Sequence, residues 1–315
     1  MDMEAFKKAM LFRYPEIIPM GVHIPPATWK EHRNELCSLI QKFPSIFGDV
    51  HEITRQLDES LKGYVEEYTD SWGCVWKNLG YGSIVKGHPV PKREDVHRLC
   101  IPEKDEGIGH GFMYLRLIDL RGYEEFMIDI AEEPPELQIL IDKVLEYNLR
   151  QIRLLLQKDD SEMIMLADDL GMQNGLPMSL EKWRKYIRPC FERIFGLCRK
   201  HNRYVYMHTD GQIYQLIDDL LECGLNAIGP QFRANGLDNL VKYCKGRIGV
   251  LLDLDRQMLP FCSKQDIFDH VREIIENFWL PEGGIGIFTE FPPDMSPENM
   301  ESVCMAMEKY MYFQG

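Results

Sequence analysis

The 315-residue chain has the composition of a globular protein with a strong negative charge. Its hydrophobic fraction is 45% and its charged fraction is 27%, and 36 basic against 50 acidic residues give a formal net charge of −14. An acidic surface repels phosphate backbones and anionic lipid, so we expect no nucleic-acid or membrane-surface binding. A highly anionic substrate is disfavoured too, unless basic residues gather locally.

The chain carries no pattern typical of export or membrane insertion. No run approaches the roughly 20 apolar residues that a membrane helix needs, and the first ten residues lack the apolar centre of a signal peptide. Nine dispersed cysteines without a CxxC pair are typical of free thiols in a reducing compartment. We therefore expect a cytoplasmic protein. Residues 312–315 (YFQG) resemble the remnant of a cleavage tag and are excluded from the fold prediction.

The N-terminal third predicts a strand and a helix followed by an irregular segment. Residues 17–22 predict a strand, and residues 28–42 predict the helix after it. Residues 50–110 are rich in Gly, His and Trp, and we expect one further strand–helix unit with insertions there. Residues 113–118 predict the next strand, before a helix over 135–157.

From residue 163 onward, short apolar runs alternate with amphipathic helical patterns. The predicted strands are residues 163–167, 204–207, 226–228, 248–252 and 285–288. The predicted helices cover about 180–200, 213–221 and 263–278, and a last one begins at 296. Their ends carry recognisable signals, namely an N-cap at Ser179, a terminating Gly224, a capping box of Ser263 with Asp266, and the pair Ser296-Pro297.

Strand–helix units in series predict a parallel sheet with covering helices. Eight units in one chain of this length fit a (β/α)8 TIM barrel better than an open sheet. Because no GxGxxG or GxxxxGK[ST] motif is present, a nucleotide-binding fold is disfavoured. We expect a single α/β barrel domain over residues 1–315, with an irregular N-terminal extension and insertions within 1–110 and regular units over 111–311.

Polar residues follow nearly every predicted strand. In a barrel these positions meet at the C-terminal face, where the chemistry of such folds takes place. They are His23, Asp70, Trp72, Asp119, Arg121, Asp168, Asp169, His208, Asp210, Gln231, Arg233, Asp253, Asp255 and Glu290. This convergence is the strongest functional signal in the sequence.

Several of these residues have two interpretations. Asp168 and Asp169 could form an acid/base pair, or one carboxylate could cap the following loop. His208 suits metal ligation or proton transfer, and a structural role is the alternative. Glu290 leaves a buried strand and needs either a structural arginine or a metal as its partner.

A second set of candidates lies in the irregular segment. Glu52, Glu67 and His88 have a spacing that could bind zinc, although such spacings arise readily among 50 acidic residues and nine histidines. Trp72, Trp76 and Tyr81 could form the wall of an aromatic pocket or pack under a long loop. His110 lies among polar neighbours, which is typical of a solvated histidine.

Several segments together resemble the uroporphyrinogen decarboxylase superfamily, and within it the corrinoid (cobalamin)-dependent methyltransferases. They are HTDG at 208–211, with DDLGMQNGLPMSLEKWRKYIRP before it, LIDDLLECGLNAIGP after it and PPDMSPENM near the end. The similarity extends from about residue 60 and is densest over 163–300. It implies a (β/α)8 barrel.

The superfamily that the chain resembles includes two activities, decarboxylation and methyl transfer. The decarboxylase binds an acidic tetrapyrrole through an N-terminal segment that carries arginine, whereas IIPMGVHIPPATWK has none here, so decarboxylation is disfavoured. Members of the superfamily that methylate thiols carry an HxCG motif and a further cysteine after the last strand, and these residues bind zinc. Asp210 stands here where the first cysteine would be, and Glu290 lies near the position of the second. Carboxylates make a harder metal site.

The resemblance therefore implies a methyltransferase component of anaerobic O-demethylation. We expect a methyl group to move from an O-methyl donor, such as an aryl methyl ether, to the corrinoid of a separate protein docked at the C-terminal face. A methanol, methylamine or methylthiol donor, or a non-catalytic corrinoid-protein-binding barrel, is the alternative.

This reading implies a role for each candidate residue. The catalytic candidates are His208, Asp168, Glu290 and Asp210, and the candidate zinc ligands are His208, Asp210 and Glu290, with Glu52, Glu67 and His88 as the alternative. The candidate substrate contacts are His23, Asp70, Trp72, Asp169, Gln231 and Asp253.

Overall fold

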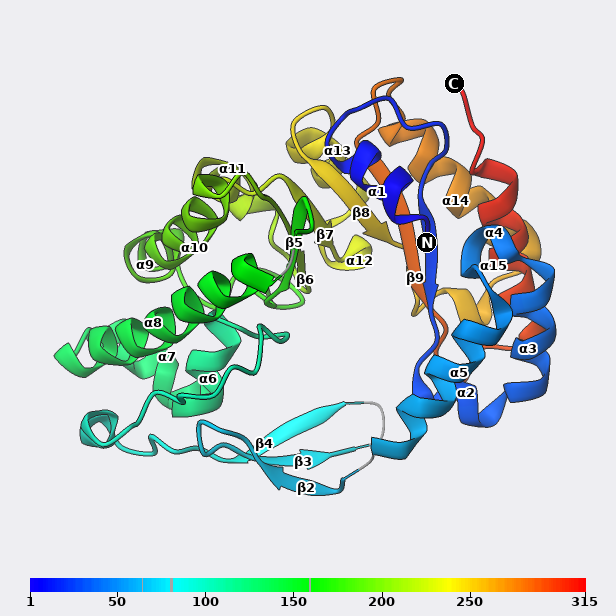
Figure 1. Ribbon diagram of the computed structural model, residues 1–315. Coiled ribbons are helices and arrows are strands. Elements are labelled where there is room, and N and C mark those ends of the chain that lie inside the picture. Colours follow the sequence, from blue (N-terminus) through cyan, green and yellow to red (C-terminus); the bar gives the residue numbers. More distant parts are fainter. Residues whose placement is uncertain (64, 80–81, 159) are drawn as a thin grey trace. The chain divides into compact units, whose positions relative to one another are not determined.

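The structure is a computed structural model that describes residues 1–63, 65–79, 82–158 and 160–315 (Figure 1). The chain forms two compact units. Unit 1 consists of residues 1–64 and 229–315, and unit 2 consists of residues 65–228. No helix in the described ranges combines the length and apolar character needed to cross a membrane.

Unit 1 contains three parallel strands in the order β1 (Met20–His23), β9 (Ile285–Glu290) and β8 (Gly249–Asp253). Val250 and Ile287 are fully buried, as expected for strands of a parallel sheet that is covered on both faces. The register places His23 opposite Glu290 at the carboxyl end of the β1–β9 pair.

Helices cover the strands of unit 1. They are α1 (Met3–Met10), α2 (Pro26–Glu31), α3 (Arg33–Lys42), α4 (Pro44–Phe47), α5 (Val50–Ser60), α12 (Phe232–Asn235), α13 (Leu237–Cys244), α14 (Lys264–Phe278) and α15 (Pro297–Tyr310), with 3-10 turns η1 (Leu61–Gly63) and η4 (Leu259–Phe261). The capping box of Ser263 with Asp266 is present, and the Ser296 side chain accepts from the Asn299 amide. Both predicted helix starts are therefore confirmed.

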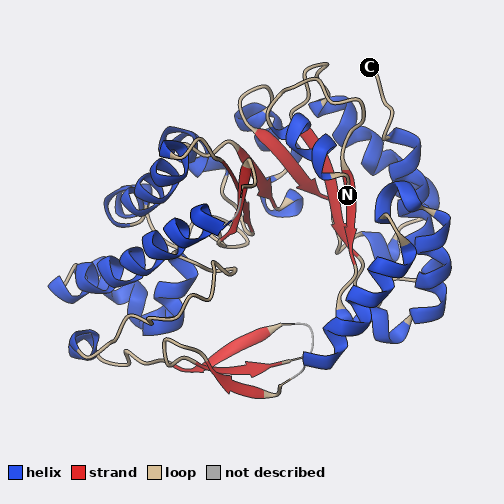
Figure 2. Ribbon diagram, viewed as in Figure 1, coloured by secondary structure: helices blue, strands red, loops and turns tan. Residues whose placement is uncertain are grey.

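Unit 2 contains a parallel pair, β5 (Met163–Ala167) and β6 (Tyr204–Thr209), and an antiparallel sheet of β2 (Glu67–Thr69), β3 (Val75–Asn78) and β4 (Ser83–Gly87). Figure 2 shows the antiparallel strands apart from the parallel pair. The helices are α6 (Tyr114–Arg121), α7 (Tyr123–Glu132), α8 (Pro135–Lys158), α9 (Leu180–Tyr186), α10 (Arg188–Lys200) and α11 (Ile217–Cys223), with 3-10 turns η2 (Arg93–His97) and η3 (Tyr214–Leu216). Strand β7 (Ala227–Pro230) contains the boundary between the two units.

The α/β class with parallel strands is confirmed, whereas a closed barrel of eight strands stays a prediction. Predicted strands 163–167, 204–207, 248–252 and 285–288 all occur, with ends shifted by no more than two residues. The predicted helix over 180–200 is two helices that meet at Ile187, where Pro189 occupies the first turn of α10.

Two predictions for the N-terminal half are wrong. Residues 113–118 were predicted as a strand, but they form the start of α6, which buries Tyr114, Leu117 and Leu120 on one face. Asp119 and Arg121 therefore lie on a helix and do not follow a strand. The region 50–110 holds α5 and the antiparallel sheet in place of a strand–helix unit, because its short strands pair with one another.

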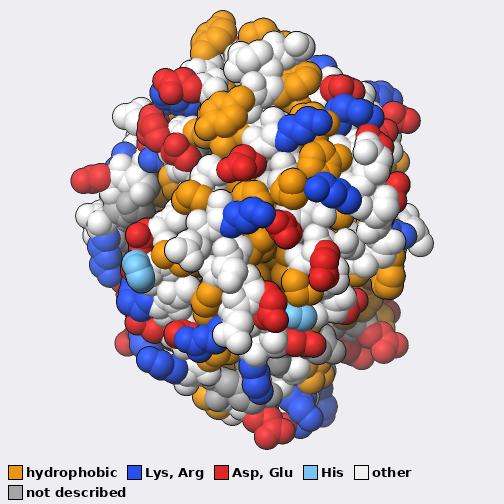
Figure 3. All heavy atoms as spheres, turned by 90° about the vertical axis from the view of Figure 1, so that its right-hand side faces the viewer, with side chains coloured by type: hydrophobic (Ala, Val, Ile, Leu, Met, Phe, Trp, Pro, Cys, Tyr) orange, Lys and Arg blue, Asp and Glu red, His pale blue; other side chains and the backbone are white. Residues whose placement is uncertain are grey.

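On the face that Figure 3 shows, the acidic side chains do not form one continuous patch. Acidic and basic side chains alternate there, with hydrophobic side chains between them. On this face, the acidic residues are therefore mixed with basic ones.

The loops that follow β5 and β6 cross at two glycines. Gly211 has a φ of +83°, and a Cβ on it would lie 2.2 Å from the carbonyl carbon of Gly171. Hydrogen bonds tie the loops together. The amides of Asp168, Leu170 and Gly171 donate to His208 O (3.0 Å), Thr209 Oγ1 (3.0 Å) and Asp210 O (3.2 Å), and the Gln212 amide donates to Met172 O (2.8 Å). A side chain larger than hydrogen at either crossing point would force the two loops apart.

We predict that Gly211→Ala destabilises the protein more than a glycine substitution at a similar φ without a neighbour. Gly236 is the control, because its φ is +73° and a Cβ there would meet nothing within 4 Å. Gly236→Ala should cost about 1–3 kcal/mol, because its φ of 73° and ψ of 145° form a conformation that residues with a Cβ rarely adopt. Gly211→Ala should cost about 1–3 kcal/mol more than this, since overpacking adds to the backbone penalty. Urea unfolding followed by circular dichroism measures both values, and equal losses would contradict the crossing.

Candidate functional site

The sequence-predicted site residues are divided between the two units. Asp70, Trp72, Asp168, Asp169, His208 and Asp210 lie in unit 2, and His23, Gln231, Asp253 and Glu290 lie in unit 1. Unit 2 also contains the pocket and the candidate metal ligands described next.

Asp169, His208 and Asp210 form a group that could hold a metal ion. Each offers one ligand atom, and these three atoms lie within 4.8 Å of one another. His208 Nε2 is 3.4 Å from Asp210 Oδ1, and the Asp210 amide donates to Asp169 Oδ1 at 3.0 Å. The three side chains are half-buried. One imidazole and two carboxylates suit a divalent ion such as zinc and leave a coordination position for a substrate, so the residues fit a metal.

His110 extends this group and has a functional contact that the sequence did not indicate. Its Nε2 lies 3.2 Å from Asp169 Oδ1, and this hydrogen bond raises the pKa of His110. The two residues are 59 positions apart, and the polar neighbours of His110 resemble those of a solvated histidine. Only the folded loops bring it to Asp169.

Asp168 is fully buried, and its carboxylate holds the start of α6. Oδ2 accepts from the amides of Met113 (3.2 Å) and Tyr114 (2.6 Å), and Oδ1 accepts from the Leu115 amide (3.0 Å). Burial raises the pKa of Asp168 to about 7, while the amide hydrogen bonds favour the charged form. The sequence left open a cap on the following loop, but the backbone amides that Asp168 accepts from belong to the start of α6. Catalysis by Asp168 stays a prediction.

Asp70 positions an arginine of α6. Its Oδ1 accepts from the amides of Trp72 and Cys74, and its Oδ2 accepts from Trp76 Nε1 (3.0 Å) and Arg116 Nη1 (2.7 Å). Trp72 is 5% exposed and packs edge-on against Tyr147. Asp70 therefore orients the Arg116 guanidinium next to an aromatic pair.

A pocket of about 210 Å³ adjoins this network. Its lining residues are Asp70, Ser71, Trp72, Arg116, Tyr147, Asn148 and the segment 106–112. The segment is held at two points, because the Gly107 amide donates to Gln151 Oε1 (3.2 Å) and the Gly111 amide donates to Ala167 O (2.8 Å). His110 belongs both to the pocket wall and to the contact with Asp169. A ligand in this pocket would therefore lie beside the candidate metal group.

A separate polar cluster occupies the strand ends of unit 1. Glu290 Oε2 lies 3.9 Å from His23 Nε2, and Glu290 Oε1 lies 3.7 Å from Arg256 Nη1. Asp253 Oδ1 accepts from the Phe232 amide at 2.6 Å, at the start of α12, and Gln231 is the N-cap residue of that helix. Glu290 thus has an arginine partner. Its metal and catalytic roles stay predictions, and so do the substrate contacts of His23, Gln231 and Asp253.

The alternative zinc ligands have other partners. Glu52 pairs with Arg55 (2.7 Å), Glu67 pairs with Lys86 (2.7 Å), and His88 Nδ1 lies 2.7 Å from Asp119 O. In the searched ranges, the group with metal-ligand spacing is the one at Asp169. Of the aromatic candidates, Trp76 stacks on Tyr68, and Tyr81 lies outside the described residues.

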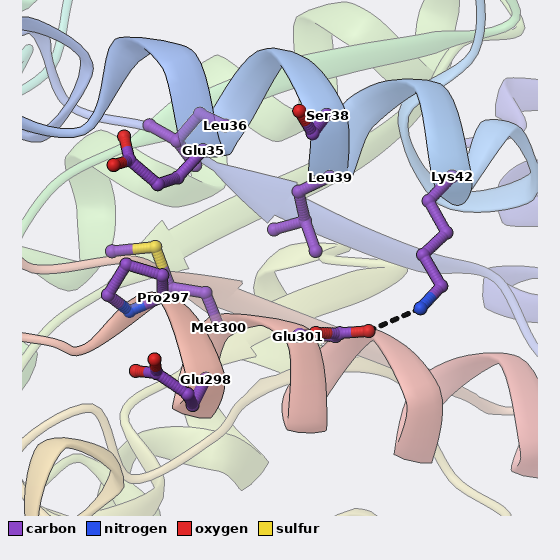
Figure 4. Close-up of a pocket in the computed structure, with 9 residues that line it drawn as sticks. All are labelled: Glu35, Leu36, Ser38, Leu39, Lys42, Pro297, Glu298, Met300 and Glu301. Carbon is purple, nitrogen blue, oxygen red and sulfur yellow. Dashed lines mark hydrogen bonds and ion pairs between the residues drawn. The ribbon is translucent and has the colours of Figure 1, made fainter.

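Unit 1 has a pocket of its own that contains none of the predicted site residues. It is about 290 Å³ in volume and lies between α3 and α15, where Leu36 and Leu39 face Met300 (Figure 4). An ion pair of Lys42 with Glu301 closes one end. Its lining has neither a histidine nor an aromatic side chain.

Comparisons with known proteins agree with an α/β fold of this class. A family model described as uroporphyrinogen decarboxylase (URO-D) matches residues 115–310. A methyltransferase from Methanosarcina mazei has a TM-score of 0.61 at 16% identity, with 96% of this chain and 97% of that chain covered. A B12-independent methionine synthase from Shewanella sp. W3-18-1 has a TM-score of 0.42 at 9% identity, with 77% and 72% covered. The curated proteins contain no match. The first structural similarity shows a shared fold.

We predict that Asp169 and His208 bind a divalent metal ion, with zinc as the probe. Isothermal titration of the metal-free protein should give one site, and Asp169→Asn and His208→Ala should each weaken it at least tenfold, since even outer contacts of metal ligands are worth 10–100-fold. Glu290→Gln is the matched control and should bind zinc like the wild type. Loss of binding in Glu290→Gln with retention in Asp169→Asn would instead support the ligand set predicted from the sequence.

Asp119 gives a prediction for the pH dependence of stability. Its Oδ2 lies 3.9 Å from Arg116 Nη1, and burial raises the pKa of this carboxyl to about 6. Between about pH 4 and pH 6, the Asp119 carboxyl therefore keeps its proton in the folded chain and has lost it in the unfolded chain. The stability that Asp119 contributes is complete below about pH 4 and is lost as the pH rises through 6.

Asp119→Asn should remove this dependence. Relative to the wild type, the variant should gain about 2 kcal/mol between pH 4 and pH 7, measured by urea unfolding across this range. The exposed Asp238→Asn controls for a change of charge alone. A constant difference between Asp119→Asn and the wild type over these pH values would show that Asp119 is not perturbed.

Proposed function

Given that the chain belongs to the uroporphyrinogen decarboxylase (URO-D) family, we propose that it is an enzyme that transfers a methyl group from an O-methyl donor. The donor is an aryl methyl ether, and the acceptor is the cobalt of a corrinoid carried by a separate protein. The observation that carries this proposal is the group of Asp169, His208 and Asp210 beside the pocket of unit 2.

The donor set of this group favours an oxygen leaving group. Carboxylate and imidazole ligands make a harder site than the thiolates that hold a sulfur substrate. Release of a phenolate is easier than release of an alkoxide, because the conjugate acid of a phenolate has a pKa of ~10. An aryl ether therefore matches the ligands better than a thiol or an alkyl ether.

In this proposal, the site residues of unit 2 have three different roles. Asp169, His208 and Asp210 would hold the metal, which when bound polarises the ether oxygen as a Lewis acid. His110 lies between Asp169 and the pocket and is positioned to hydrogen-bond the departing oxygen. Trp72 and Tyr147 supply an aromatic wall, against which a phenyl ring packs.

The reaction is testable with free cob(I)alamin as the acceptor. The metal-loaded protein, with cob(I)alamin and a panel of methoxyarenes, should yield the corresponding phenols, measured by chromatography, together with methylated corrinoid, measured by absorbance. His208→Ala should lower the rate at least 100-fold, because a metal or general-acid contribution of 10²–10⁴ is lost. His201→Ala is the control, since this exposed histidine follows α10 away from the group.

Formation of methylated corrinoid from methanol or a methylamine, and from no methoxyarene, would reassign the donor. If no donor reacts while zinc still binds at Asp169, the proposal of methyl transfer fails.

A further inference from the structure

The guanidinium of Arg116 presents one edge to the pocket of unit 2. Its contacts with the protein all involve Nη1, which donates to Asp70 Oδ2 at 2.7 Å and lies 4.0 Å from Cys74 Sγ and 3.9 Å from Asp119 Oδ2. Within the described ranges, no acceptor pairs with Nε or Nη2 of this side chain. Arg116 lines the pocket and is 20% exposed, and the Nε–Nη2 edge keeps hydrogen-bond donors for a ligand.

That edge has the geometry of a carboxylate-binding fork. A guanidinium donates two parallel N–H···O bonds to a carboxylate, and such charge-assisted pairs are the strong hydrogen bonds of proteins. Asp70 holds Arg116 from the opposite side and is itself satisfied by three further donors, two backbone amides and Trp76 Nε1. The arginine is therefore fixed in orientation before a ligand arrives.

The acidic residues around the pocket have partners of their own. Glu106, the other carboxylate in the lining, accepts from Ser71 Oγ at 2.6 Å and lies 3.6 Å from Lys104 Nζ. Asp70 and Asp119 both approach Nη1 and leave the opposite edge uncovered. One negative charge can therefore be accepted at Arg116, although a ligand with several carboxylates would meet an acidic surrounding.

The rest of the pocket limits the ligand to a small molecule and suits an aromatic one. The volume of about 210 Å³ is below the 300–1,000 Å³ of sites for drug-sized ligands. Trp72, Tyr147 and Phe112 contribute ring surface, and His110 stands in the same wall next to Asp169. A ring whose carboxylate pairs with Arg116 thus has a further substituent available for the metal group.

We propose that this pocket binds an aromatic monocarboxylate through Arg116, and that the methyl donors are methoxybenzoates. The identification as donors rests on the proposed function, whereas the carboxylate site stands on the geometry of Arg116. Arg116 is in this view a specificity-determining residue that selects benzoates over neutral methoxyarenes.

Binding of a ligand that cannot react tests the carboxylate site by itself. Benzoate and its neutral isostere benzamide are titrated calorimetrically into the wild type, Arg116→Lys and Arg98→Lys, after thermal melting has confirmed that each variant is folded. The wild type should bind benzoate at least tenfold more tightly than benzamide. Arg116→Lys keeps a cation beside Asp70 and Asp119 but loses the fork, so its benzoate affinity should fall at least tenfold and its benzamide affinity should stay within about twofold.

Arg98→Lys is the matched control, because it makes the same substitution at an exposed arginine outside the pocket lining, and it should bind benzoate as tightly as the wild type. Equal affinity of the wild type for benzoate and benzamide, or a parallel loss of both in Arg116→Lys, would overturn the carboxylate site.

Turnover separates this inference from the proposed function. With cob(I)alamin as the acceptor, the wild type should demethylate 4-methoxybenzoate at least tenfold more efficiently, in kcat/KM, than methoxybenzene, and Arg116→Lys should abolish the preference through KM. Turnover of both ethers with equal efficiency would refute the donor class and leave methyl transfer intact. Tight benzoate binding without turnover of any ether would support the carboxylate site and refute methyl transfer.

Discussion

The candidate site depends on the close approach of two backbones at Gly171 and Gly211. These glycines follow different strands, and the absence of a Cβ on both allows the loops to touch and to exchange hydrogen bonds. The Asp210 amide then reaches the carboxylate of Asp169, and His208 lies on the same side. Main-chain contacts thereby hold three potential ligands from two strand ends. Such a group is less sensitive to side-chain rotamers than a group that long side chains place.

The end of β5 also organises the pocket. Asp168 receives the first amides of α6, and Asp169, the next residue, contacts His110 and Asp210. Because α6 carries Arg116, the two residues directly after β5 contact both the candidate metal group and the helix with the proposed carboxylate-binding arginine. The two adjacent aspartates thus have different contacts, because Asp168 accepts the amides of α6 and Asp169 belongs to the candidate metal group.

Local patterns predicted the second half of the chain well, because its signals are short-range. Strand 163–167 is a continuous apolar run, and the capping box at Ser263 and Asp266 spans four residues. Residues 113–118 were misjudged because their helix is stabilised by a carboxylate 55 positions away. His110 was missed for the same reason, since its partner Asp169 is distant in sequence. The order of the strand ends could be predicted from sequence, but which side chains meet there depends on how the two glycine loops cross.

The double anchoring of segment 106–112 has a consequence for recognition. A wall tied to Gln151 at one end and to Ala167 at the other has little conformational freedom to lose when a ligand enters, so the ordering entropy that normally opposes binding is small. A wall of this kind also adapts poorly to other shapes. Closely related rings with an extra ortho or meta group would therefore be separated by steric exclusion.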